Sequence, residues 1–133
     1  MQDRLFVFGT LLSGYDHPMA RLVAQSCELI GPAHCQGRLF LVRHYPGMVL
    51  SDDPAEKVYG ELYRMKWPQE LLPSLDEYEG FGDGFPPPNE FVRELCRVTT
   101  QSGESCEAWT YLYNRPVDRL PRIASGRFME HVT

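Results

Sequence analysis

A single glutamate follows an apolar helical pattern in the middle of the chain. Apolar residues recur at helical spacing from Pro68 to Tyr78, and Glu79 follows them directly before Gly80. A carboxylate there lies at the negative end of the helix dipole, and Asp76 and Glu77 add like charge. Partial burial would also disfavour ionisation, so we expect the pKa of Glu79 to rise towards the range that suits a general acid or base. The alternative is a solvated acidic helix end.

A second candidate element is the loop Phe8-Gly9-Thr10-Leu11, which follows a short apolar strand. Successive backbone N–H groups in such a turn can point inward together and form a concavity that binds an anion. Glycine at position 9 suits this role, because a Cβ atom there would block a closely approaching ligand. The segment lacks the Lys-Ser/Thr end of a phosphate loop and the spacing of a dinucleotide-binding fingerprint. An ordinary turn at a strand end is the alternative.

Four further polar residues have more than one interpretation. Asp76 is expected to hydrogen-bond local backbone groups and to hold the turn, rather than to take part in catalysis. Glu61 and Tyr63 share one face of a predicted strand, so they could line a pocket, form a buried structural pair or point outward. Arg93 could be the counter-charge to an acidic group or part of a salt bridge on a strand face.

The elements that must position these residues follow from periodicity and from turn residues. A short helix begins at Pro18 and is expected to end at Gly31-Pro32, well before the next strand. A second helical segment runs from Pro68 to Tyr78, where Pro73 predicts two short pieces or a kinked helix. Tyr45-Pro46-Gly47 and the proline-rich segment 82–89 are expected to be a turn and an exposed loop. Strands are predicted at Arg4–Phe8, Gly37–Val42, Lys57–Met65, Phe91–Thr99 and Cys106–Tyr113.

This pattern predicts one α+β domain over all 133 residues. Most connections between the predicted strands are short, which favours antiparallel pairing and a mixed sheet or a small barrel. The tail after Asn114 has little pattern, and the sequence does not indicate an oligomeric state.

Composition excludes several classes of partner. The net charge of −5 argues against a nucleic-acid ligand, since phosphate binding needs a basic surface. The apolar stretch near the start, Leu5–Phe8, is too short to span a membrane, and no secretory signal surrounds it. We therefore expect a cytoplasmic protein with no membrane partner.

Metal and redox chemistry are also not indicated. No C-x-x-C spacing occurs, and the histidines lack the close spacing of metal ligands, so we expect no metal and no cofactor. The cysteines are interpreted as buried or half-buried thiols that pack as small apolar groups. The cysteines are Cys27, Cys35, Cys96 and Cys106, and the histidines are His17, His34, His44 and His131.

An ordered series of short motifs runs along most of the chain. After Phe8-Gly9-Thr10-Leu11 come Gly37-Arg38-Leu39-Phe40, Tyr45-Pro46, Val58–Tyr63, Leu75–Gly80, Phe91-Val92-Arg93 and Ala108–Tyr111. In order and spacing, this series resembles the γ-glutamyl cyclotransferase family, including its γ-glutamylamine and bacterial branches. The similarity covers residues 5–113, and Ile123–Gly126 is a looser match to the closing segment of the family.

The resemblance implies a small mixed, mostly antiparallel β-barrel flanked by short helices, with a pocket at one barrel mouth. It implies that Phe8, Gly9, Thr10 and Leu11 bind the substrate, a small γ-glutamyl compound, and that Glu79 is the catalytic acid/base. The implied reaction is attack of the α-amine on the γ-carbonyl, which releases 5-oxoproline and a free amine or amino acid. Phe8 stands where the family usually has tyrosine. A non-catalytic binding or interaction module on the same fold is the alternative.

Overall fold

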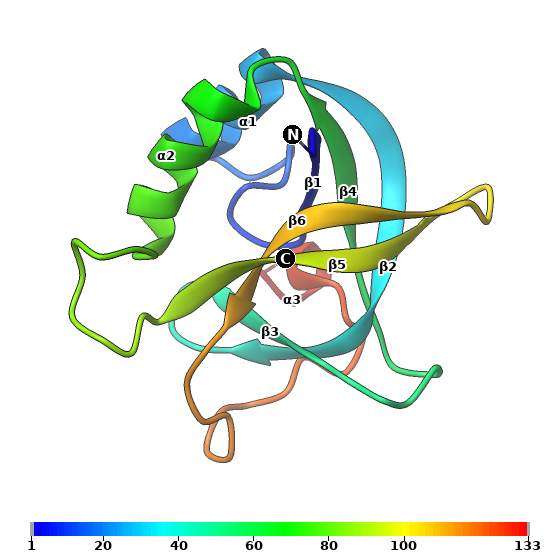
Figure 1. Cartoon of the computed structure of the whole chain (residues 1–133). Coiled ribbons are helices and arrows are strands. Elements are labelled where there is room, and N and C mark those ends of the chain that lie inside the picture. The colour runs from blue at the N-terminus through cyan, green and yellow to red at the C-terminus, as the bar shows by residue number, and fades with distance from the viewer. Residues whose placement is uncertain (1, 133) are drawn as a thin grey trace.

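The computed structural model describes residues 2–132, which have an α+β fold (Figure 1). The elements in chain order are β1 (Arg4–Val7), α1 (Pro18–Ser26), β2 (Cys27–Leu41), β3 (Pro46–Leu50), β4 (Lys57–Met65), α2 (Pro68–Glu79), β5 (Phe91–Thr100), β6 (Ser105–Tyr113) and α3 (Phe128–Val132). Helices flank a curved sheet whose edges come together through the pairing of β2 with β5.

Five of these strands close into a barrel in the order β2, β4, β1, β6, β5, because β5 returns to pair with β2. The pairing of β1 with β6 is parallel, and the other pairings are antiparallel. The sixth strand, β3, extends the sheet beyond β2. The fold is therefore the small mixed, mostly antiparallel barrel with short helices that was expected.

Strand β2 corrects one prediction. The first helix ends at Ser26, and β2 begins at once and runs through Gly31 and Pro32, which were expected to separate helix from strand. The pairing register with β4 shifts between Leu29 and Gly31, and the φ of Gly31 is 147°. β2 pairs with β5 only from Ala33, so Pro32 lies where β2 is still an edge strand, and proline is tolerated there.

Strand β3 corrects a second prediction. Tyr45-Pro46-Gly47 was expected to be a turn, but the turn precedes Pro46, and β3 begins at that residue. Proline has no N–H and is suited to the first position of a strand. Gly47 leaves room for the ring of Tyr113 at the end of β6, because a Cβ atom at this position would lie 2.8 Å from Cγ of Tyr113.

Helix α2 is continuous despite Pro73, so of the two predicted alternatives, two short pieces or a kinked helix, the first is wrong. Proline removes one backbone hydrogen bond from a helix. Here the buried leucines Leu71, Leu72 and Leu75 pack the helix onto the barrel and compensate for that loss. The predicted glycine cap is confirmed, since Gly80 has the left-handed conformation with φ 71° and ψ 35°.

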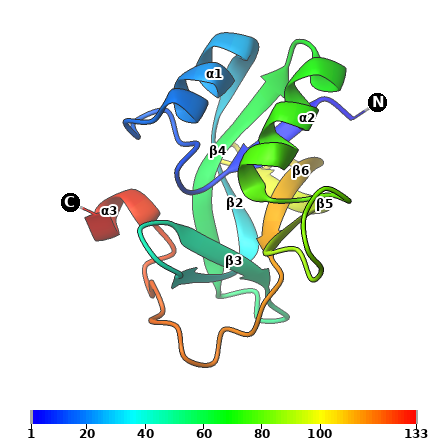
Figure 2. The same ribbon diagram turned by 90° about the vertical axis from the view of Figure 1, so that its left-hand side faces the viewer.

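The core has two parts, one on each side of the barrel wall. One fills the barrel and includes Phe6, Leu39, Met48 and Phe128. The other lies beneath α1 and α2, which pack side by side against one side of the barrel (Figure 2). Phe128 belongs to α3, so the weakly patterned tail supplies a side chain to the barrel interior, which the sequence did not indicate.

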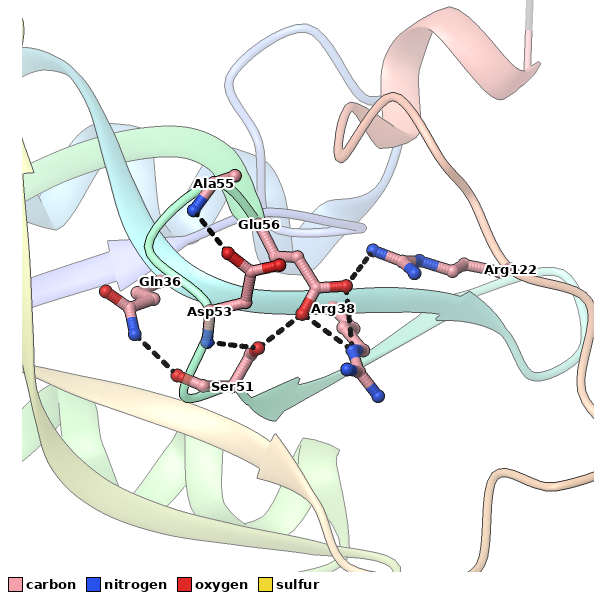
Figure 3. A network of polar contacts seen from close by, with 7 residues as sticks. All are labelled: Gln36, Arg38, Ser51, Asp53, Ala55, Glu56 and Arg122. Atoms are coloured by element: carbon pink, nitrogen blue, oxygen red, sulfur yellow. Dashed lines mark hydrogen bonds and ion pairs between the residues drawn. The ribbon is translucent and has the colours of Figure 1, made fainter.

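A network of ion pairs and hydrogen bonds links the tail to the loop between β3 and β4 (Figure 3). Glu56 accepts hydrogen bonds from Ser51, from Arg38 and from Arg122 of the tail, at 2.8 Å for the last. These hydrogen bonds, that of Ser51 first and that of Arg38 next, lower the pKa of Glu56 to about 2.

None of the helices in residues 2–132 combines the length and the hydropathy that crossing a membrane requires.

Candidate active site

A cavity of about 230 Å³ lies where segments distant in the sequence meet. Its walls come from β1 and the loop after it, the segment 44–46, the end of α2, the start of β5 and one residue of β6. The five residues predicted to bind substrate or to act as acid/base all line it, namely Phe8, Gly9, Thr10, Leu11 and Glu79. The fold thus brings the two candidate elements together around one space.

The loop after β1 is a tight turn. The N–H of Leu12 donates to the carbonyl oxygen of Gly9 at 3.0 Å. The N–H groups of the two central residues, Thr10 and Leu11, donate no hydrogen bond within residues 2–132. Both residues line the cavity, so their N–H groups are the candidate donors for a ligand anion.

The requirement for glycine at position 9 has a packing reason that the sequence did not reveal. A Cβ atom at Gly9 would lie 2.6 Å from Cγ and 2.9 Å from Cδ of Pro46. The loop can therefore approach the start of β3 only with glycine here. Phe8, next to it, is buried, and its ring lies 6.2 Å from that of Phe6 in the barrel core.

Glu61 holds the far side of this loop. Its carboxylate accepts hydrogen bonds from the backbone N–H of Ser13 at 2.8 Å and from the Ser13 hydroxyl at 2.6 Å. Tyr63 is buried beneath the helices. Neither Glu61 nor Tyr63 is among the cavity-lining residues, so the structure does not support the interpretation in which they line the pocket.

Glu79 is the last residue of α2, and its carboxylate makes no hydrogen bond within the described part of the chain. Burial raises its pKa to about 8, and the negative charge of Glu90 is the second cause. The direction agrees with the prediction. The charged neighbour differs, because Asp76 and Glu77 were expected to supply the like charge.

Asp76 has another partner. Its carboxylate accepts two hydrogen bonds from the Arg93 guanidinium, at 2.8 and 3.2 Å, and one from the Tyr111 hydroxyl at 2.7 Å. The prediction that it bonds local backbone groups is therefore wrong. Cζ of Arg93 also lies 4.4 Å from the ring centroid of Trp109. Arg93 is thus the counter-charge that anchors the end of α2, and with it Glu79, to β5 and β6.

Glu90 and Tyr45 are cavity residues that sequence reasoning missed as site residues. The Tyr45 hydroxyl donates to the Glu90 carboxylate at 2.5 Å. Burial, and then this hydrogen bond, raise the pKa of Tyr45 to about 12. Glu90 ends a proline-rich loop with no helical or strand pattern, so no local signal indicated that it lines the same cavity as Glu79.

The histidines do not gather in this site. His17 caps α1, since its Nδ1 accepts the Met19 N–H at 3.0 Å. Among residues 2–132, no group of three or more His, Cys, Asp or Glu side chains is placed to hold a metal ion. Cys27, Cys35 and Cys96 are buried and Cys106 is half-buried, and all four are free thiols.

Comparison with models of known protein families shows which family the chain belongs to. The family model for γ-glutamyl cyclotransferases, AIG2-like, matches residues 5–130. The chain belongs to this family. The γ-glutamyl cyclotransferase family acts on small γ-glutamyl compounds. Membership of this family supports a cyclotransferase activity in general terms.

Two relatives in this γ-glutamyl cyclotransferase family have related sequences. The γ-glutamylcyclotransferase family protein YtfP of Escherichia coli strain K12 is 32% identical over 130 residues, which are 96% of each chain. The γ-L-glutamyl-butirosin B γ-glutamyl cyclotransferase of Niallia circulans is 32% identical over 115 residues, which cover 84% of this chain and 67% of the relative.

Solved structures have the same γ-glutamyl cyclotransferase fold. The solution structure of YtfP from Escherichia coli gives a TM-score of 0.62 and covers 98% of this chain and 99% of its own. The crystal structure of YkqA from Bacillus subtilis gives a TM-score of 0.74 at 26% identity. That match covers 98% of this chain and 41% of YkqA, so the chain spans about two fifths of that protein.

Proposed function

We propose that this chain is a γ-glutamyl cyclotransferase that releases 5-oxoproline and a free amine or amino acid from a γ-glutamyl compound. Glu79 is the acid/base, and the loop Phe8–Leu11 holds the γ-glutamyl head. One observation supports this proposal above the others. A carboxyl group with a pKa of about 8 and no hydrogen-bond partner in residues 2–132 lines the same cavity as the unused N–H groups of Thr10 and Leu11.

The head of the substrate carries one negative and one positive group, and the cavity offers a counterpart for each. The free N–H groups of Thr10 and Leu11 are donors for the α-carboxylate. The Glu79 carboxylate is the acceptor for the α-ammonium. Binding of that ammonium favours the charged form of Glu79, because an opposite charge nearby offsets part of the cost of burial.

Proton transfer is the first step of the proposed reaction. The protonated α-amine has no free electron pair, so Glu79 must accept one of its protons before it can attack. Burial raises the pKa of Glu79 towards the range in which amino groups titrate, so this transfer costs less than it would to an ordinary carboxylate.

Ring closure follows. The free amine attacks the γ-carbonyl carbon, and the new C–N bond closes a five-membered ring. Because both reacting groups belong to one molecule, the site has only to select the folded conformer. Glu79 then returns its proton to the departing nitrogen, and the bond between that nitrogen and the carbonyl carbon breaks. The ring nitrogen gives up its remaining extra proton through Glu79, and the freed amine takes up a proton.

The test is the release of 5-oxoproline, measured by mass spectrometry from γ-glutamyl amines and γ-glutamyl amino acids. The wild-type chain should release it, and Glu79→Gln should lose at least about a hundredfold in rate, as expected for removal of a general acid/base. Glu77→Gln is a matched control, because Glu77 is an exposed residue of α2 that does not line the cavity. A folded Glu79→Gln chain with the wild-type rate would refute the role of Glu79, and a wild-type chain that binds these compounds unchanged would instead be a binding module.

A further inference from the structure

The lining of the cavity carries acidic groups and no basic side chain. Glu79 and Glu90 contribute two carboxyl groups, and neither lysine nor arginine occurs among the lining residues. The nearby guanidinium of Arg93 is bound to Asp76 through two hydrogen bonds. Arg43 is close enough for its charge to act on Tyr45, but it is exposed and does not line the cavity.

Glu90 is held in place on the wall. The Tyr45 hydroxyl donates to its Oε2 atom at 2.5 Å, and the backbone N–H of Asn114 donates to its carbonyl oxygen at 2.8 Å. Its Oε1 atom has no hydrogen-bond partner in the described part of the chain. Glu90 is only partly exposed, whereas His44 beside Tyr45 is exposed. Glu90 is therefore an oriented and partly exposed carboxylate on the cavity wall, beside Tyr45 and the exposed His44.

The γ-glutamyl head does not need this second carboxylate. In the proposed function, the α-carboxylate takes the N–H groups of the loop, and the α-ammonium takes Glu79. Glu90 then remains as a negative group with an unused oxygen on the wall of a cavity without a lining cation. A carboxylate on the leaving group would meet like charge at this position, and an ammonium would meet opposite charge.

We propose that Glu90 is a specificity-determining residue that selects γ-glutamyl compounds whose leaving amine carries a further ammonium group and no carboxylate. This inference rests on the proposed function and adds a substrate class to it, namely γ-glutamyl conjugates of diamines and other polycationic amines. Glu90 takes no part in bond making or breaking. Its charge also raises the pKa of Glu79, but that effect is common to all substrates, so selection at the distant end of the leaving group is read from the ratios between substrates at one pH.

A matched set of three substrates tests the inference. The γ-glutamyl derivatives of 1,4-diaminobutane, pentylamine and 5-aminopentanoate share one four-carbon spacer and end in an ammonium, a methyl and a carboxylate group. We expect kcat/KM for 5-oxoproline release to fall in that order, by about tenfold for each change of charge, since Glu90 lies in a partly solvated site. Raising the salt concentration should reduce these ratios, because added ions screen the interaction.

Two variants locate the effect. Glu90→Gln should bring the ammonium and methyl substrates to within about twofold of each other. Glu104→Gln makes the same change of net charge in the β5–β6 hairpin, at a residue that does not line the cavity, and should keep the wild-type order. An equal loss by Glu90→Gln on all three substrates would overturn the inference, because Glu90 would then bind the common head.

The wild-type ratios need no variant, so they test the inference even if Glu90→Gln does not fold. Equal rates for the three substrates, or a preference for the carboxylate substrate, would overturn it and leave the proposed function intact. Absence of 5-oxoproline from every substrate would refute the proposed function itself, and this inference with it.

Discussion

The hydroxyl oxygen of Tyr78 lies 2.9 Å from Oγ1 of Thr10. Thr10 belongs to the loop that lines one side of the cavity, and Tyr78 directly precedes Glu79 in α2. This hydrogen bond therefore links the proposed head-binding loop to the helix end that carries the proposed acid/base. It fixes the separation of two elements that are far apart in the sequence.

Removing this link should weaken catalysis more than the fold. Tyr78→Phe keeps the ring and deletes the hydroxyl, and we expect kcat/KM to fall about three- to tenfold, the equivalent of one typical hydrogen bond. Thr10→Val should have a similar effect. Since both changes delete one bond, the double variant should be little worse than either single variant in a double-mutant cycle. Fully additive losses would show that the two side chains act separately.

The pH dependence of the reaction should report the ionisation of Glu79. Its carboxylate form is the base, so kcat/KM should rise as pH increases towards about 8, the pKa of this group. Glu90→Gln removes a negative charge that raises this pKa, so the rising limb should move to lower pH. The substrate amine titrates in the same range but is the same in both measurements. A limb at the same pH in both proteins would contradict the assignment.

Burial of Glu79 should also be visible in the stability of the fold. The pKa is about 4.5 in the unfolded chain and about 8 in the folded one, so the folded state binds the proton more tightly. Stability is therefore highest below pH 4.5 with respect to this group and declines as pH rises towards about 8. Each unit of difference corresponds to about 1.4 kcal/mol, so the total is of the order of a few kcal/mol.

Glu79→Gln removes this titration. We expect its advantage over the wild-type chain in urea unfolding to be small at pH 5 and to grow up to about pH 8. Glu77→Gln, which makes the same substitution at an exposed position, is the matched control. The same advantage for Glu79→Gln at both pH values would mean that its carboxyl group does not titrate differently in the two states.

Local patterns in the sequence predicted the parts of the site that depend on local structure. Glu79 ends a helix because the apolar spacing stops there and Gly80 adopts the left-handed conformation. The strand Lys57–Met65 was predicted with the bounds that the structure has. Within this strand Gly60 indicates either a bulge or a close approach of another segment, and a Cβ atom there would clash with the carbonyl oxygen of Val7.

Contacts between segments that are distant in the sequence could not be predicted from local patterns. The partner of Asp76 is Arg93, and the charge beside Glu79 comes from Glu90, which lies at the end of an irregular loop. Neither relation leaves a periodic trace, because it depends on how β5 passes the end of α2. The strand that runs through Gly31 was missed for a related reason, since its bulge is stabilised by pairing with β4.

The contact between Gly9 and Pro46 gives a prediction that separates packing from ligand binding. The φ of Gly9 is not positive, so alanine could adopt its backbone conformation, but the added Cβ would lie 2.6 Å from Cγ of Pro46. We expect Gly9→Ala to cost about 1–3 kcal/mol in unfolding free energy, as overpacking does. It should also lower kcat/KM, because the loop is displaced. Pro46→Ala removes the clashing atoms.

The double variant Gly9→Ala with Pro46→Ala should therefore recover most of the stability that Gly9→Ala loses, measured by urea unfolding against Pro46→Ala alone. If the clash with Pro46 is the whole reason for glycine, 5-oxoproline release should recover in parallel. If stability returns and activity does not, the Cβ atom of residue 9 obstructs the substrate directly, as the sequence first suggested. If neither returns, the steric contact with Pro46 does not explain the requirement for glycine at this position.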